Sequence, residues 1–314
     1  MKYELNKEDA SMMREMSQFF PWQRRLLFKL MPENLSQVKD IKKMLSPIAA
    51  FCRQERSGII EYLEDVSKTD EHYFRVYESS DCWAFDNVGV AMASYLPSNS
   101  AGMCQGIENG KRNWNAIETK CIGLGDPYCE FKLVPGEIDE LRDSLEAVDS
   151  TIMESVHDRL MHRLIGFLLD GKPLVDRPSL GSEIQLHAVG HTFSFPYLAG
   201  ERYQMALRMG GSKVGREVGE HLMEAGLSHD EAVKRVINFL KHCKVGKVTA
   251  GETIKIEDNC ESFYMKLNTL KPEEACCYFT TGFLNGLFSA VKNQRVREIK
   301  CVALGDPYCE WEII

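Results

Sequence analysis

Apolar residues recur along the chain at two spacings, and each spacing predicts a different kind of element. From Glu137 to Leu169 they return every three or four residues, which is the repeat of a long amphipathic helix. The stretches YFRVYES and FYMKLN alternate apolar with polar residues, as half-buried strands do. Each is followed by cysteines that open an apolar helix, Cys82 in the first case and the pair Cys276 and Cys277 in the second. The chain is therefore expected to mix helices with strands.

The same order of elements occurs twice. In each half a helix that ends near a glycine precedes a strand, as IAAFCRQERSGIIEYLEDV in the first half and INFLKHCKVGKVTAGETIKI in the second. The first copy also carries a long polar loop, PSNSAGMCQGIENGKRNW, where the second has only KNQRV. Residues 200–226 carry glycines within an amphipathic pattern and predict a pair of helices. Their MGGSKVG stretch lacks the Lys-Ser/Thr pair of a phosphate loop, so close helix packing explains it better.

One segment shows the duplication directly. Residues 118–131, ETKCIGLGDPYCEF, and residues 298–311, EIKCVALGDPYCEW, are identical at ten of fourteen positions and lie 180 residues apart. That offset is too long for a solenoid repeat and fits a duplicated domain. We expect a first domain at 1–135, a connecting helix and linker at 136–184, and a second domain at 185–314. The two domains would form an intramolecular pseudo-dimer.

Each repeated segment places three potential metal ligands around a tight turn. The spacing is Glu-x2-Cys-x7-Cys, and the Gly-Asp-Pro-Tyr between the cysteines can fold two short strands into a hairpin. Zinc takes four ligands in a tetrahedron, and the cysteine that opens the upstream helix is the natural fourth donor. In the second half this is Cys277 or Cys276, and in the first it is Cys82 or Cys104 of the long loop. The hairpin donors are Glu118, Cys121, Cys129, Glu298, Cys301 and Cys309.

The spacing of these donors raises a difficulty. In an ideal strand, residues three apart face opposite sides of the sheet. Glu118 and Cys121 could then point the same way only through a β-bulge or through the reach of the glutamate side chain. The cysteines could also be small core residues without a metal, but their appearance twice around the same turn favours zinc. A Cys3Glu set fills all four positions, so the ion is expected to be structural, one per domain, and not catalytic.

Charge and composition narrow the setting. The net charge is −8 and the basic residues are scattered, whereas a nucleic-acid-binding protein usually shows a basic patch. No apolar run reaches the ~18 residues that a membrane span needs, and the N-terminus lacks the apolar core of a signal peptide. We therefore expect a cytoplasmic protein that does not span a membrane. In a reducing compartment its eleven cysteines suit metal binding better than disulfides.

The combination of Cys-Trp, an apolar helix and Glu-x2-Cys-x3-Gly-Asp-Pro-x-Cys-x-Phe/Trp resembles the 4-vinyl-reductase domain family. That family includes the sensor domains of phenol- and xylene-responsive transcription activators. The resemblance is closer in the second half, where Gly282 and Gly286 follow Cys277 at the family spacing. It implies an α+β fold in which an antiparallel sheet packs with helices around a small-molecule pocket beside a zinc ion. The implied zinc ligands are Cys277, Glu298, Cys301 and Cys309, and in the first half Cys82, Glu118, Cys121 and Cys129.

The function implied by the resemblance is binding and not catalysis. The expected ligand is apolar and planar, an aromatic compound or a tetrapyrrole, and the expected setting is pigment handling or photosystem assembly with a protein partner. The alternatives are a scaffold without a ligand and a reductase acting on a tetrapyrrole, although the motif contains no hydride-carrier site. Tyr203, Tyr278 and Phe283 are the candidate pocket residues. His187 and His191 have a spacing that suits metal binding on a helix, but their alternating surroundings favour ordinary polar roles.

Overall fold

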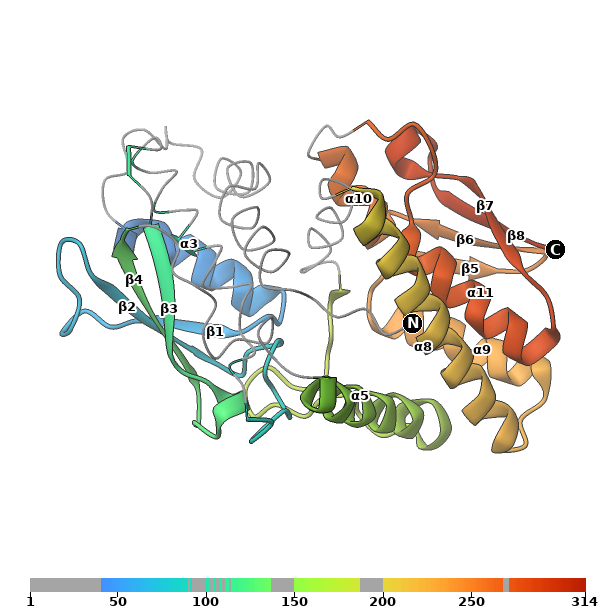
Figure 1. The fold of residues 1–314 in the computed structure, drawn as a ribbon, viewed down its shortest axis with the longest axis horizontal. Helices are drawn as coiled ribbons and strands as arrows, with labels where there is room; N and C mark the ends of the chain where they lie inside the picture. The colour runs from blue at the N-terminus through green and yellow to red at the C-terminus, as the bar shows by residue number, and fades with distance from the viewer. Residues whose placement is uncertain are drawn as a thin grey trace. The chain divides into compact units, whose positions relative to one another are not determined.

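The computed structural model confirms the α+β class with two repeated sheet-and-helix units (Figure 1). It divides into two compact units, Met1–Arg159 with Val175–Ser182, and Leu160–Leu174 with Glu183–Ile314. The domain limits expected from the sequence stay a prediction. The residues that the structure describes are 41–89, 91, 100–101, 104, 108, 111–112, 114–136, 150–186, 200–267 and 271–314. The pair His187 and His191 lies outside them.

Each unit contains a four-stranded antiparallel sheet, and the two sheets share one topology. The strand order is β1-β2-β4-β3 in the first sheet and β5-β6-β8-β7 in the second, so every strand has a counterpart at the same position. The last two strands of each sheet form the hairpin that the repeated segment predicts. The bounds are β1 Ile59–Tyr62, β2 His72–Tyr77, β3 Trp114–Lys120, β4 Cys129–Pro135, β5 Lys247–Ala250, β6 Thr253–Glu257, β7 Val296–Lys300 and β8 Cys309–Ile313.

One face of each sheet is buried, and this face carries a hairpin cysteine. In the second sheet the buried Ile256 of β6 pairs with Cys309 of β8, and Ile254 pairs with Trp311. In the first sheet, in the same way, Val76 of β2 pairs with Cys129 of β4. Because side chains alternate along a strand, these pairs all point toward the core. The alternation of the sequence thus fixes which way each cysteine faces.

A helix precedes the first strand of each sheet, as the sequence predicts. These are α3 (Ile41–Gln54) and α9 (His229–His242). Helix α9 begins after Ser228, whose hydroxyl accepts the Glu231 N–H at 3.3 Å and caps the first turn. The glycine that follows α9 allows a close approach, because a Cβ at Gly246 would lie 2.5 Å from the carbonyl oxygen of Glu257. A larger residue there would push the first strand away from its neighbour.

The second unit holds a tight helix pair. Helix α8 (Glu201–Glu224) packs against α11 (Tyr278–Lys292), and α11 also contacts strand β7 (Figure 1). A Cβ at Gly211 of α8 would sit 2.5 Å from the Phe279 carbonyl oxygen. Gly282 of α11 meets the backbone of Arg208 in the same way. The two backbones therefore touch without side chains between them, which is the close packing expected of these glycines.

Two segments differ from the sequence-based expectation, and a third is described only in part. Residues 200–226 do not form two helices, because α8 runs unbroken through its glycines, whose contacts with α11 offset their low helix propensity. The FYMKL stretch is not a strand but part of helix α10 (Cys260–Leu267). The long helix expected from Glu137 appears as α5 (Ser150–Asp170), and residues 137–149 lie outside the described residues.

Part of the predicted linker packs firmly on the first unit. The buried Glu78 carboxylate accepts the N–H groups of Ser179 at 2.9 Å and Leu180 at 2.8 Å. The guanidinium of Arg177, also buried, donates to the carbonyl oxygens of Arg56 at 2.6 Å and Glu78 at 3.3 Å. Buried charges of this kind are costly unless they are hydrogen-bonded. Residues 175–182 are therefore an ordered part of the first unit and not a free tether.

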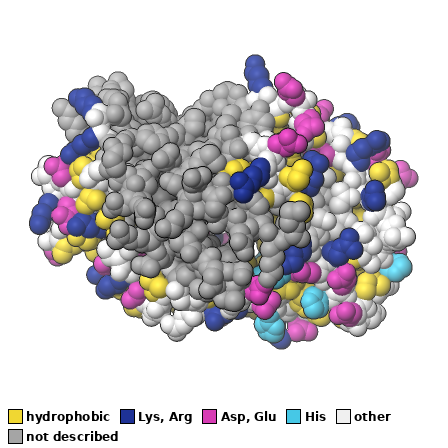
Figure 2. All heavy atoms as spheres, viewed as in Figure 1, with side chains coloured by type: hydrophobic (Ala, Val, Ile, Leu, Met, Phe, Trp, Pro, Cys, Tyr) yellow, Lys and Arg dark blue, Asp and Glu magenta, His cyan; other side chains and the backbone are white. Residues whose placement is uncertain are grey.

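Two further features concern membrane spans and surface charge. Among the helices that the structure describes, none has the length and apolar character needed to cross a membrane. On the face shown in Figure 2, Lys and Arg side chains are interspersed with Asp and Glu over the coloured part of the surface. This mixture agrees with the scattered charges of the sequence.

Two neighbouring glycines of α8 provide a matched test of the helix contact. Gly211→Ala should lower the free energy of unfolding by about 1–3 kcal/mol, because its Cβ would press on the α11 backbone. Gly210→Ala, which meets nothing within 4 Å, should be neutral or stabilise by up to about 1 kcal/mol. Urea unfolding of both variants measures the difference, and equal effects would contradict the packing described.

Candidate metal centre

The repeated turn holds the two hairpin cysteines in each unit close together. In the second unit, the short 3-10 helix η5 (Val302–Leu304) follows Cys301, and Gly305 ends it with φ at +105°, a conformation that glycine adopts without strain. The Asp306 carboxylate then accepts the Cys301 N–H at 2.9 Å. In the first unit η2 (Ile122–Leu124) has the same form, with Gly125 at φ +100° and an Asp126 to Cys121 bond of 2.9 Å. The turn therefore fixes the position of the cysteine that precedes it.

A β-bulge resolves the difficulty of the Glu-x2-Cys spacing. In the second hairpin the register shifts after Glu298, so that Glu298 pairs with Trp311 and Lys300 pairs with Glu310. The extra residue, Ile299, restores the alternation and turns Cys301 to the buried face that Glu298 also uses. The first hairpin has the same shift between Glu118 and Lys120. Of the two explanations offered by the sequence, the bulge is the one that the structure shows.

Four donors converge in the second unit. One ligand atom each from Cys277, Glu298, Cys301 and Cys309 lies within 4.8 Å of the other three. Cys277, and not Cys276, belongs to this group; it is the N-cap residue of α11. A cluster of this kind could hold a metal ion. The four residues come from two different parts of the fold, since the hairpin supplies three and the start of the helix supplies one.

The spacing of the sulfur atoms suits a tetrahedral metal. Two thiolates bound to one ion at 2.3 Å are about 3.8 Å apart in a tetrahedron. In the second unit, the Cys277 and Cys309 sulfurs are 3.5 Å apart. In the first unit, Cys82 and Cys121 are separated by 3.8 Å, and Cys121 and Cys129 by 3.9 Å. All eleven cysteines are free thiols, so no disulfide accounts for these distances.

The second-unit carboxylate is buried without its full set of partners. Glu298 Oε2 accepts the Cys277 N–H at 3.3 Å and the Thr281 hydroxyl at 3.2 Å. Glu298 Oε1 is buried and has no hydrogen-bond partner. Burial, together with the nearby Cys301 sulfur, raises the pKa of Glu298 to about 9. A buried carboxylate oxygen of this kind, placed among sulfur donors, fits the ligand set of a metal cation.

The thiols of the second-unit cluster also have shifted pKa values. Burial raises the pKa of Cys277 well above its ordinary value. The pKa of Cys301 is instead lowered, because its sulfur accepts from the thiols of Cys276, Cys277 and Cys309. A bound cation would compensate the charge of thiolates in this buried place.

Several side chains around the cluster were not foreseen from the sequence. The Asn259 amide donates to the Cys277 sulfur at 3.3 Å, and the Ser262 hydroxyl lies 3.1 Å from the Cys309 sulfur. Such contacts orient metal ligands and stabilise thiolates. Thr281 could have been found, since it follows Cys277 by one helical turn. Asn259 and Ser262 lie in a segment that the first copy lacks, so the repeat gives no signal for them.

In the first unit the structure groups three of the four predicted ligands. The sulfurs of Cys82, Cys121 and Cys129 lie within 4.8 Å of one another, and Glu118 is not among the grouped atoms. Cys104 is buried but is not among the grouped sulfurs, so Cys82 is the cysteine that joins the hairpin pair. Glu118 Oε1 is buried without a hydrogen-bond partner, as in the second unit. Burial and the Cys121 sulfur raise the pKa of Glu118 to about 10.

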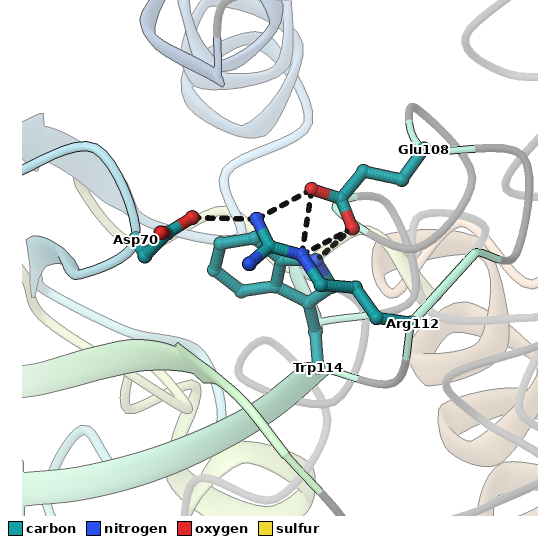
Figure 3. Close-up of polar contacts among 4 residues, drawn as sticks. All are labelled: Asp70, Glu108, Arg112 and Trp114. Atoms are coloured by element: carbon teal, nitrogen blue, oxygen red, sulfur yellow. Dashed lines mark hydrogen bonds and ion pairs between the residues drawn. The ribbon is translucent and has the colours of Figure 1, made fainter.

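A second charged cluster in the first unit consists of residues that hydrogen-bond to one another (Figure 3). The Arg112 guanidinium donates to Glu108 at 2.8 Å and to Asp70 at 2.5 Å, and it lies over the Trp114 ring at 4.9 Å. Trp114 Nε1 also donates to Glu108, at 2.9 Å. The Arg112 charge lowers the pKa of Glu108. This group therefore stabilises the start of β3, and its carboxylates are already engaged.

The three candidate pocket residues are all buried. Tyr203 lies in α8, and Tyr278 and Phe283 lie in α11, where both belong to the core of the second unit. The Arg208 guanidinium stands 5.6 Å from the centre of the Tyr278 ring. Tyr278 directly follows the grouped Cys277, so one of the three is next to the metal cluster in the chain. Their role in ligand binding stays a prediction.

Comparison with known proteins gives distant matches. No family model matches the chain. An uncharacterized protein of Methanocaldococcus jannaschii is 32% identical over 101 residues, which are 32% of this chain, and the chain spans about half the length of that relative, 55%.

Two solved structures are of the kinds that the sequence resembles. A vinyl-4-reductase family protein from Methanocaldococcus jannaschii matches with a TM-score of 0.33 and 15% identity, over 54% of this chain and 97% of that one. The phenol-responsive sensory domain of the transcription activator PoxR, with phenol, has a TM-score of 0.33 and 19% identity, over 41% and 71%.

The buried Glu261 gives a prediction about pH. It accepts from the N–H groups of Phe279 at 2.7 Å and Thr280 at 2.9 Å and so caps helix α11. Burial raises its pKa from 4.5 to about 7. Between these values the folded chain binds more protons than the unfolded one, so stability falls as pH rises through this window. The loss from this group is up to roughly 3 kcal/mol.

Glu261→Gln should remove this part of the pH dependence. Urea unfolding at pH 5 and pH 8, with zinc present, should show a smaller difference for the variant than for the unmodified protein. Glu252→Gln, at an exposed position, should keep the original difference. A Glu261→Gln variant with the full pH dependence would show that another group titrates in this range.

Proposed function

We propose that the chain is a non-enzymatic small-molecule-binding protein in which a zinc ion braces each half. The observation that carries the proposal is the convergence of Cys277, Glu298, Cys301 and Cys309, with an orphaned carboxylate oxygen among them. Zinc suits this donor set because it accepts sulfur and oxygen ligands in a tetrahedron. The first half would hold its ion through Cys82, Cys121, Cys129 and Glu118.

The position of the cluster supports a structural role for the metal. It joins the β7–β8 hairpin to the residue just before helix α11. The same two parts are also linked by hydrogen bonds, such as the one that Trp311 Nε1 donates to the Thr281 hydroxyl at 2.9 Å. Three sulfurs and one oxygen complete the coordination of zinc, which leaves no position for a reacting water. The ion would therefore fix the end of α11 against the sheet, and with it Tyr278 and Phe283.

The proposed ligand is apolar and planar, an aromatic compound or a tetrapyrrole. The proposal rests on the sequence resemblance to sensor domains, and PoxR is described as phenol-responsive. The buried aromatic side chains of Tyr203, Tyr278 and Phe283 provide the kind of lining that such ligands require. Pigment handling with a partner protein is the cellular role that we propose for a tetrapyrrole ligand. The free state of all eleven cysteines supports a reducing, cytoplasmic setting.

Metal content tests the first part of the proposal. The purified chain should carry two zinc ions by native mass spectrometry. Cys309→Ser should remove one ion and lower the free energy of unfolding by on the order of 4 kcal/mol. Cys243→Ser, a buried thiol outside the donor group, should keep both ions. A metal-free native protein, or a Cys309→Ser variant that still holds two ions, would argue against the zinc sites.

Ligand titration tests the second part. Tryptophan fluorescence of the zinc-loaded chain should change saturably with phenol or with a porphyrin. Phe283→Leu should weaken that binding roughly tenfold through the loss of ring contact area. Phe288→Leu, a buried change on the same helix, is the control for general destabilisation and should bind normally. If neither compound binds while both zinc ions are present, the chain is better explained as a scaffold.

A further inference from the structure

The two metal clusters differ at the residue before the helix-side cysteine. In the second unit Cys276 precedes Cys277, and in the first unit Asp81 precedes Cys82. These neighbouring residues are not members of the grouped donors. Each nevertheless brings one further potential ligand to the edge of its cluster, a sulfur in one unit and an oxygen in the other.

Cys276 lies at a distance that suits a shared metal. Its side chain is fully buried, and its sulfur is 3.7 Å from the Cys301 sulfur. This is close to the separation of about 3.8 Å expected for two thiolates on one tetrahedral ion. The second unit thus has four thiols and one carboxylate around the same place, which is one donor more than a tetrahedral ion can use.

Asp81 occupies the corresponding place in the first unit. Its Oδ1 accepts the Ser80 hydroxyl at 3.2 Å, whereas its Oδ2 is buried without a hydrogen-bond partner. The Asp81 carboxylate interacts electrostatically with the Cys121 sulfur, which places it near the cluster. The spare donor of the first unit is therefore a hard oxygen ligand.

We propose that the residue before the helix-side cysteine sets the metal preference of each unit. With a thiophilic ion, Cys276 replaces Glu298 and gives the second unit an all-sulfur site. The first unit has Asp81 at this position and keeps three sulfurs with oxygen. The proposal rests on the metal sites proposed above and goes further, because it makes the two sites unequal.

The exchange is chemically balanced. The bond from the metal to the Glu298 oxygen breaks, and a bond from the metal to the Cys276 sulfur forms. The Cys276 thiol loses its proton to the released carboxylate or to solvent, so the charge of the site is unchanged when the proton stays on Glu298. Oε2 of Glu298 keeps its hydrogen bonds to the Cys277 N–H and to Thr281.

The consequence for selectivity follows from ligand softness. Thiolates favour thiophilic ions such as cadmium and copper(I), whereas carboxylates favour harder ions. Replacing an oxygen by a sulfur therefore strengthens the preference for cadmium over zinc. The second unit should take up cadmium ahead of the first unit when both compete for a limiting amount.

Cadmium-113 NMR of the full chain tests the proposal, because the chemical shift reports the number of sulfur ligands. We expect two resonances, one in the range for four sulfurs and one in the range for three sulfurs and an oxygen. Cys276→Ser should move the first resonance into the range of the second and lower the cadmium-over-zinc preference of that site roughly tenfold. Asp81→Cys should make the opposite change in the first unit.

A third variant keeps the test decisive if Cys276→Ser does not fold. Glu298→Gln should leave the four-sulfur resonance in place, and its loss would overturn the proposal. Two three-sulfur resonances that Cys276→Ser does not alter would also overturn it, while leaving the proposed metal sites standing. A chain that shows no bound cadmium at all would count against both this proposal and those sites.

Discussion

Acidic donors that are buried together cannot all ionise unless a cation joins them, and this constraint shapes both halves of the protein. In the second half, Cys277, Glu298, Cys301 and Cys309 meet in the core, where burial raises the pKa of Glu298 and Cys277. Burying polar atoms together costs free energy unless their charges and hydrogen bonds are compensated. As a metal site it becomes a cross-link between a hairpin and a helix, which is the kind of contact that a small domain can use for stability.

The rest of the second unit serves to bring the helix to that cross-link. Helix α11 reaches the cluster by its first turn, where Glu261 accepts the backbone N–H groups of Phe279 and Thr280. Along its length it touches the backbone of α8 through glycines on both helices. A helix held at one end by a carboxylate and along one side by close backbone contact has little freedom to move. The position of Cys277 is therefore set by packing as well as by any metal.

The sequence predicts those features that depend on local pattern. The duplicated Glu-x2-Cys-x7-Cys motif predicts the hairpins, and the alternating stretch YFRVYES predicts strand β2. The bulge at Ile299 was one of two explanations that the spacing left open, because a period of two cannot show where an extra residue is inserted. Helix α10 was missed since FYMKL has a short alternating pattern that fits a strand equally well. Asn259 and Ser262 contact the sulfurs only after the chain folds back, and no spacing rule covers such contacts.

The turn between the hairpin cysteines also affects the order of events during folding. Asp306 and Gly305 close the turn through contacts with residues no more than five positions away, and local contacts of this kind form early and at low entropic cost. Two sulfurs can thus be held side by side while the start of α11, more than twenty residues upstream, is still undocked. An arriving ion would first be bound by the two hairpin sulfurs as a bidentate site. The later docking of helix α11 would then add the Cys277 sulfur.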